Sequence, residues 1–116
     1  RPVMTSAELV TLQQLVEQVR VDRSLYEYIV RLAAATREHP DLRIGVSPRG
    51  TLALTHAARA TALLHDRDYV VPDDIVSNVV PVCAHRIVTR DHMRDADAET
   101  GTRIIKQVLE SIPSPA

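Results

Sequence analysis

Arg49 lies at a position in the sequence where a positive charge needs an explanation. Ser47 and Pro48 form a strong helix-start signal, with serine as the cap and proline as the first helical residue. Arg49 therefore falls in the first turn of a helix, where the partial positive charge of the helix end disfavours a cation. A protein tolerates this when an anion lies in front of both, because backbone amides and a guanidinium that converge on one point bind phosphate. The alternative is an ordinary surface arginine that pairs with a nearby carboxylate.

The other side chains that could bind a metal or attack a substrate have simpler interpretations. No two of the five histidines lie four residues apart, so we expect solvated or capping histidines and no metal site. Cys83 has only His85 at metal-ligand spacing and is interpreted as a small core residue. Asp73 and Asp74 fit the first turn of a helix, where they suit the helix dipole. The five histidines are His39, His56, His65, His85 and His92.

The sequence lacks the motifs that would make it a hydrolase by itself. It has no phosphate-binding Gly-x-x-x-x-Gly-Lys-Ser/Thr loop, no Gly-x-Ser-x-Gly elbow and no His-Glu-x-x-His pair. We therefore expect the chain alone to be a folded monomer without ATPase activity.

The composition favours a small all-α domain. The 116 residues include no Phe or Trp and only three Gly, whereas a strand-rich fold of this size would need more turn glycines. Fourteen basic and fifteen acidic residues give a net charge of −1, which argues against nucleic acid or an anionic membrane as partner. A single cysteine, no signal peptide and no apolar run of membrane-spanning length predict a cytoplasmic location. Because the chain opens without methionine, we expect a piece of a longer protein.

The first half of the chain predicts two amphipathic helices. A hydroxyl cap followed three residues later by a glutamate predicts a helix over about residues 6–19. Asp22 can cap a second helix that runs to about His39, because Pro40 stops it. Residues 40–46 are then expected to form a loop. The apolar stripes are Leu9, Leu12, Leu15, Val16 and Val19 in the first helix, and Leu25, Tyr28, Ile29, Leu32, Ala33 and Thr36 in the second.

The second half predicts three more helices, so the expected architecture is a small bundle of four to five helices. The helix capped by Ser47 is rich in alanine, which allows its neighbours to approach closely. Its apolar stripe is Leu54, Ala57, Ala58, Thr61 and Leu64. This helix is expected to run to about His65 and to be followed by a polar turn over 66–68 and an extended piece over 69–71. The next helix begins at Pro72, carries Ile75 and Val79, and can reach Cys83 and Ile87 with a bend at Pro81. A partly looped stretch over 89–101 and a last helix over 102–111 complete the expected segments.

The chain resembles MoxR-family AAA+ ATPases over nearly its whole length. The segment that carries most of the likeness runs from Ile44 to Leu54 and resembles the family's Gly-Ala-Ser-Pro-Arg segment. Other pieces agree in the same order along the chain, and together they are specific, although Pro-Asp-Asp alone occurs at many helix starts. These pieces are Tyr28-Ile29-Val30, Thr36-Arg37, Ala57-Ala58-Arg59-Ala60, Arg67-Asp68-Tyr69-Val70, Pro72-Asp73-Asp74-Ile75 and His85-Arg86.

The resemblance implies that residues 1–116 form a single AAA+ lid domain, the C-terminal helical lid, separated from its ATP-binding P-loop core. It implies that Arg49, with Ser47 and Pro48 beside it, is the sensor-two arginine that reaches the γ-phosphate of ATP bound with Mg by that core. The implied parent is an ATPase engaged in chaperone-like remodelling. The implied partners are the lid's own core, neighbouring subunits of a homo-oligomeric ring and proteins with von Willebrand factor A domains.

Three positions depart from the family pattern. Val46 stands where alanine is usual. Asp66 stands where glycine is common, so this position is expected to need a left-handed backbone, which aspartate tolerates better than most residues. Val71 stands where a capping threonine is usual, which removes a cap worth about 1 kcal/mol.

Two other functions remain open at this point. The long middle helix, the short extended link and the Pro-Asp-Asp helix start also fit a histone-fold-like protein-interaction module, although no basic face supports it. A helical DNA-binding domain is a third possibility, against which the near-neutral charge argues.

Overall fold

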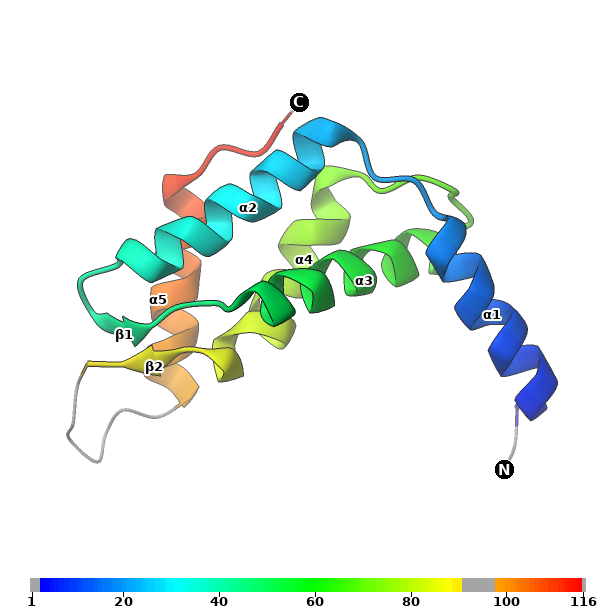
Figure 1. Ribbon diagram of the computed structural model, residues 1–116, viewed down its shortest axis with the longest axis horizontal. Coiled ribbons are helices and arrows are strands. Elements are labelled where there is room, and N and C mark those ends of the chain that lie inside the picture. The colour runs from blue at the N-terminus through cyan, green and yellow to red at the C-terminus, as the bar shows by residue number, and fades with distance from the viewer. Residues whose placement is uncertain (1–2, 91–97, 116) are drawn as a thin grey trace.

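The computed structural model describes residues 3–90 and 98–115 of the chain. Within these ranges it contains five α-helices, one short 3-10 turn and a small two-stranded sheet, which confirms the all-α expectation (Figure 1). The elements are α1 (Ser6–Gln18), α2 (Arg23–Glu38), β1 (Leu42–Ile44), α3 (Pro48–Leu64), α4 (Pro72–Cys83), the 3-10 turn η1 (Ala84–Arg86), β2 (Val88–Thr89) and α5 (Ala98–Ser111).

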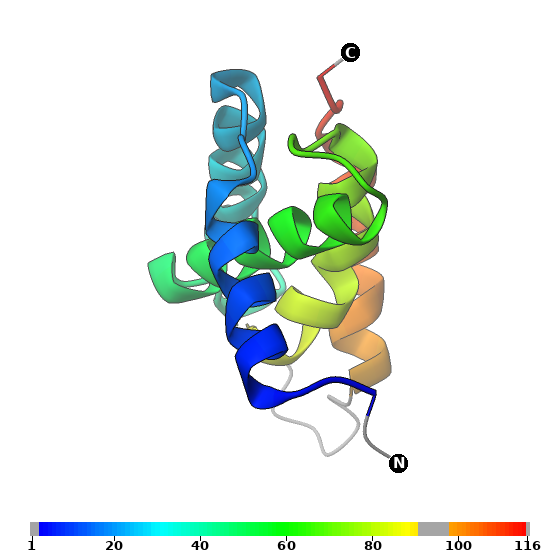
Figure 2. The same cartoon turned by 90° about the vertical axis from the view of Figure 1, so that its right-hand side faces the viewer.

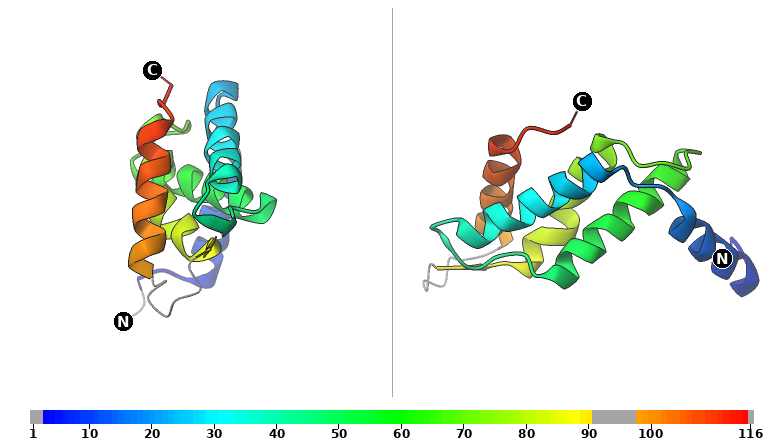
Figure 3. Two further views of the ribbon diagram at one scale, coloured as in Figure 1. Left: turned by 90° about the vertical axis from the view of Figure 1, so that its left-hand side faces the viewer. Right: turned by 45° about the horizontal axis from the view of Figure 1, so that its top comes forward.

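The helices pack in two layers joined by α3. Helix α2 forms one layer, α4 and α5 lie side by side in the other, and α3 runs obliquely from the α2 side towards α4 (Figures 1 and 2). Helix α1 projects from one end of this bundle (Figure 3). No helix in the described part of the chain is long and apolar enough to cross a membrane.

Helix α2 supplies the largest share of the core. All six members of its predicted stripe are buried, which confirms the pattern read from the sequence. They pack with apolar side chains of α3, α4 and α5 in one continuous cluster, since a helix with a single apolar stripe must bury it against neighbouring elements. Cys83 is buried in this cluster, as predicted for a small core residue.

The predicted first stripe is confirmed only at its carboxyl end, where Val16 and Val19 are buried. The capping box forms as expected, with Thr5 and Glu8 exchanging side-chain-to-backbone hydrogen bonds. Of the stripe residues within α1, only Val16 is buried, while Leu9, Leu12 and Leu15 remain 48%, 38% and 41% exposed. The reason is tertiary: α1 projects from the end of the bundle, so the described residues cover its apolar stripe only in part.

Helix α3 begins where predicted, and its predicted stripe is confirmed only in part. Leu54 and Ala58 are buried, whereas Leu64, expected in the core, is 83% exposed at the end of the helix. Because α3 contacts helices on more than one side, its buried residues are spread over a wider arc than one stripe. They are Gly50, Leu54, Thr55, Ala58 and Ala62.

Two predicted boundaries are also wrong, and a third is confirmed only in part. The expected loop over residues 40–46 contains β1, which pairs antiparallel with β2. The helix from Pro72 continues through Pro81 but ends at Cys83, so Ile87 lies outside it. Helix α5 begins at Ala98, four residues earlier than expected. Strands of two or three residues that pair across more than forty residues leave no periodic signal in the sequence.

The α3–α4 connection is held by an ion pair. Nη1 and Nη2 of the Arg67 guanidinium donate to the Asp74 carboxylate at 2.6 and 2.9 Å. Asp74 also accepts from the amide of Val71 at 2.8 Å. Asp74 is therefore a buried ion-pair partner, and the helix-dipole interpretation is incomplete for it. Asp66 has φ 59°, which confirms the expected left-handed backbone, and Val71 provides no side-chain cap.

Candidate functional site

Arg49 lies at the exposed amino end of α3. Ser47 caps the helix by accepting a hydrogen bond from the amide of Gly50 at 3.1 Å, and Pro48 is the first helical residue, as predicted. The first turn of α3 extends beyond the α2 layer in the side views (Figures 2 and 3). Arg49 is exposed and makes no ion pair or hydrogen bond with any residue in the described ranges. The alternative of a surface arginine paired with a carboxylate thus receives no support from the described residues.

The backbone at this helix end offers fewer free amides than a phosphate cradle requires. Pro48 has no N–H group, the amide of Gly50 donates to Ser47, and the amide of Thr51 donates to the Ser47 carbonyl at 3.0 Å. The amide of Arg49 is left without a described partner. Any anion recognised here would therefore depend mainly on the Arg49 guanidinium, with a single amide beside it.

The carboxyl end of α2 positions the residue that precedes this helix start. The amide of Val46 donates to the buried hydroxyl of Thr36 at 2.8 Å, and the carbonyl of Val46 accepts from Nε of Arg37 at 2.9 Å. Both polar groups of the Val46 backbone are thus bonded to consecutive residues of α2. The side chain of Val46 is buried as well, so the extra volume relative to alanine is packed in the core.

Gly45 permits this close approach. A Cβ atom at Gly45 would lie 2.5 Å from the backbone nitrogen of Arg37 and 2.7 Å from the carbonyl carbon of Thr36, both backbone atoms that cannot rotate away. The sequence singled out Arg37 and Gly45 only through the family resemblance, and Thr36 also as a member of the α2 stripe, and it assigned none of them this role. Their role in the structure is to hold the chain against α2 just before Arg49.

A shallow, open groove runs along the exposed face of α3 from Arg49. Its lining includes Leu52, His56 and Arg59 from α3 and two side chains from neighbouring helices, Glu17 of α1 and Tyr26 of α2. Arg59 donates to the Tyr26 hydroxyl at 2.8 Å, and its Nε is buried without a partner in the described residues. The groove therefore combines two guanidinium groups and an imidazole with a single carboxylate, Glu17, which pairs with neither arginine in the described structure.

The other candidate residues take structural positions. His39 accepts from the amide of Asp41 in the turn after α2, and His65 bonds the Thr61 carbonyl near the end of α3. His85 is exposed, and His92 lies outside the described residues. Burial raises the pKa of the Cys83 thiol to about 11. Within residues 3–90 and 98–115, no three His, Cys, Asp or Glu side chains are grouped to hold a metal ion.

Comparison with known proteins identifies the class of this helical bundle. The sequence model of the AAA lid domain family matches residues 34–108. The uncharacterized protein YeaC of Bacillus subtilis is 39% identical over 114 residues, which cover 98% of this chain and 35% of YeaC. The chaperone MoxR1 of Mycobacterium tuberculosis is 32% identical over 125 residues, 99% of this chain and 33% of MoxR1. The chain thus spans about a third of the length of the curated relatives it matches.

A solved structure has the same arrangement. A provisionally assigned ATPase from Cytophaga hutchinsonii superposes with a TM-score of 0.82 at 27% sequence identity, covering 95% of this chain and 36% of that one. The arrangement of the helices is therefore shared with this ATPase structure. The chain belongs to the AAA lid domain family, as a lid of the MoxR type. The comparisons give no support to the histone-fold-like alternative.

Proposed function

We propose that Arg49 is the sensor-two arginine of this lid and contacts the terminal phosphate of ATP held by a separate P-loop core. ATP bound there supplies the terminal phosphoryl group and its negative charge, and the core would hold the accompanying Mg²⁺. The observation that carries the proposal is that Arg49 is exposed and unpaired in the described chain, while the backbone before it is fixed against α2.

The chemistry of the side chain fits this role. A guanidinium presents several donors in a rigid plane and matches phosphate oxygens in pairs. Its position in the first turn of α3 places it beside the partial positive charge of the helix end, which also favours an anion. The described chain contains no P-loop, so the proposal assigns phosphate recognition to Arg49 and the remaining nucleotide contacts to the core.

The arrangement also supports coupling between nucleotide state and movement. Arg49 lies at one end of the 17-residue helix α3, and the other end continues into the connection fixed by the Arg67–Asp74 ion pair. A displacement of Arg49 by the nucleotide would therefore be transmitted along α3 to the α4 end of the bundle. We infer that the lid moves as a rigid body relative to the core in a ring of subunits and that this movement serves chaperone-like remodelling, in line with the relative that is named chaperone MoxR1.

Replacing Arg49 in the full-length enzyme tests the proposal. Arg49→Ala should lower ATP turnover by roughly tenfold or more, because charge develops on the phosphate in the transition state. Binding of ADP, which lacks the terminal phosphate, should change little. Arg49→Lys should restore little turnover, because an ammonium group does not reproduce the planar fork.

Arg31→Ala is the matched control, because Arg31 is an exposed arginine on α2 outside the groove. It should leave turnover unchanged. Wild-type turnover in Arg49→Ala would reject the sensor role. Unfolding of the 116-residue chain by Arg49→Ala would also reject it, since a surface residue should change stability by no more than about 0.5 kcal/mol.

A further inference from the structure

Helix α1 presents an apolar surface that the bundle does not cover. Leu9, Leu12 and Leu15 follow one another at spacings of three residues, on the side of α1 that also carries the buried Val16. We call these three leucines the α1 face. The same side of the helix is therefore buried where α1 meets α3 and uncovered where α1 extends past the bundle (Figures 1 and 3).

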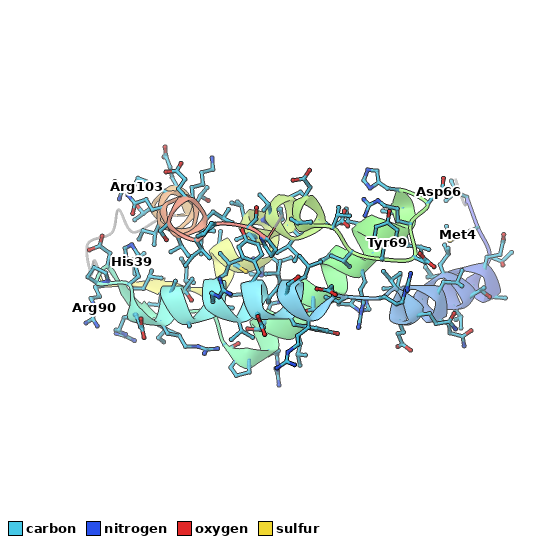
Figure 4. The ribbon with its side chains drawn as sticks, turned by 90° about the horizontal axis from the view of Figure 1, so that it is seen from above. Met4, His39, Asp66, Tyr69, Arg90 and Arg103 are labelled. Atoms are coloured by element: carbon cyan, nitrogen blue, oxygen red, sulfur yellow. The ribbon has the colours of Figure 1, made fainter. Side chains whose placement is uncertain are left out.

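The base of α1 is firmly tied to the bundle. The amide of Arg20 donates to the Asp68 carbonyl at 2.9 Å, and the Arg20 carbonyl accepts from the amide of Val70 at 2.9 Å. These two bonds join the α1–α2 junction to the α3–α4 connection that the Arg67–Asp74 pair stabilises. Met4, just before α1, lies at the same end of the molecule as Asp66 and Tyr69 of that connection (Figure 4). A partner that binds α1 would therefore hold the whole bundle.

The superposition on a much longer protein includes at least part of α1. The superposition on the Cytophaga hutchinsonii structure covers 95% of this chain, and the remaining 5% of 116 residues is fewer than the 13 residues of α1. That superposition uses only 36% of the longer chain. By contrast, the AAA lid family model begins at residue 34, so α1 lies outside the shared lid module. At least part of α1 is thus matched in a protein that has a further two thirds of its chain.

The size of the α1 face argues against a second copy of this chain as its occupant. A stable interface between separate proteins buries about 800 Å² on each partner. Three leucines that already bury about half of their surface fall well short of that area. A small apolar contact suffices when the two parts belong to one chain, because linkage raises their effective concentration to about the millimolar range.

We propose that the α1 face docks on the P-loop ATPase core of the longer protein and anchors the lid to it. This inference rests on the proposed function, because it assumes such a core. Arg49 and the α1 face would then be two separate contacts with the core, one sensitive to the terminal phosphate and the other independent of it. The bundle lies between these two contacts and is held together by α3 and by the two backbone hydrogen bonds of Arg20 with Asp68 and Val70.

Thiol labelling in the full-length protein tests the docking without reference to ATP turnover. Leu12→Cys should react with a maleimide roughly tenfold or more slowly in the full-length protein than in the 116-residue chain, because a covered thiol reacts only when the contact opens. Val30→Cys is the matched control, since Val30 is a 58% exposed apolar residue on α2. It should react at the same rate in both proteins. The native Cys83 is buried and contributes a slow background, measured in the unsubstituted proteins.

The possible results separate docking from the sensor role. Rapid labelling of Leu12→Cys in the full-length protein would overturn the proposal, whatever Arg49→Ala does to turnover. Slow labelling of Leu12→Cys already in the 116-residue chain, with a rate that falls further as the protein concentration rises, would also overturn the proposal. It would identify a second copy of the chain as the occupant. Slow labelling in the full-length protein alone, unchanged when Arg49→Ala is added, would support docking even if Arg49 proved dispensable for turnover.

Discussion

The hydroxyl of Thr36 links the end of α2 to the amide of Val46 through a buried 2.8 Å hydrogen bond. The same hydroxyl donates to the Ala33 carbonyl at 2.6 Å, so it is satisfied on both sides. Because Arg49 follows Val46 by three residues, this single side chain helps to set where α3 begins. The exposed arginine therefore depends on a buried threonine in another helix.

Thr36→Val should destabilise the 116-residue chain by about 1–3 kcal/mol. The substitution keeps the shape of the side chain but leaves the buried Val46 amide without an acceptor. Thr36→Ser, which keeps the hydroxyl, should lose less. Urea unfolding of both variants measures the difference, and a Thr36→Val protein as stable as the wild type would show that the hydrogen bond contributes nothing.

Gly45→Ala should destabilise the chain more than Gly50→Ala. The added Cβ at Gly45 would meet backbone atoms of α2 at 2.5–2.7 Å, whereas at Gly50 it would meet a side-chain carbon of Val46 at 2.8 Å, which can shift more readily than backbone. Overpacking against fixed atoms costs about 1–3 kcal/mol. Thermal unfolding of the two variants provides the comparison; equal melting temperatures would argue against a fixed contact at Gly45.

Asp74→Asn should lower the free energy of unfolding by about 3 kcal/mol, because it leaves a partly buried arginine without its charge partner. Asp73→Asn is the matched control, since Asp73 is the exposed neighbour in the same helical turn. It should stay within about 0.5 kcal/mol of the wild type. Similar losses in the two variants would favour the helix dipole over the ion pair as the source of stability.

The stability difference between wild type and Asp74→Asn should depend on pH. Burial by itself raises the pKa of Asp74, but the hydrogen bonds from Arg67 and Val71 and the charge of Arg67 together lower it below its ordinary 3.8. The unfolded chain therefore binds this proton at higher pH than the folded chain. The contribution is fully present above the ordinary pKa and is lost as the pH falls through the folded value. Urea unfolding from neutral pH to about pH 2 should show the two proteins converging; a constant difference would contradict the prediction.

Ala58→Leu should destabilise the chain by about 1–3 kcal/mol, because Ala58 is 1% exposed within the core. Ala57→Leu should have a smaller effect, since Ala57 is only partly buried and lines the open groove. Melting temperatures of the two variants distinguish these positions. If Ala57→Leu were the more damaging change, the assignment of the packed face of α3 would be wrong.

Local signals in the sequence were sufficient to predict the start of α3 and the buried stripe of α2. A cap followed by proline and a 3.6-residue apolar period each act within a few residues. The left-handed backbone at Asp66 was predicted from the family pattern, which has glycine at this position. The likeness around Arg49 also identified the AAA lid family, because it rests on residue types and order. Such features can be recognised without knowing which helices pack against each other.

Tertiary structure decided the features that depend on contacts between distant residues. The β1–β2 pairing, the Thr36–Val46 and Arg67–Asp74 bonds and the space above Gly45 involve partners whose approach no local pattern encodes. The same is true of α1, whose leucines have a helical period but stay about half exposed within the described chain. Periodicity shows which side of a helix is apolar, whereas burial requires another surface at that place, and only the folded chain shows where one is missing.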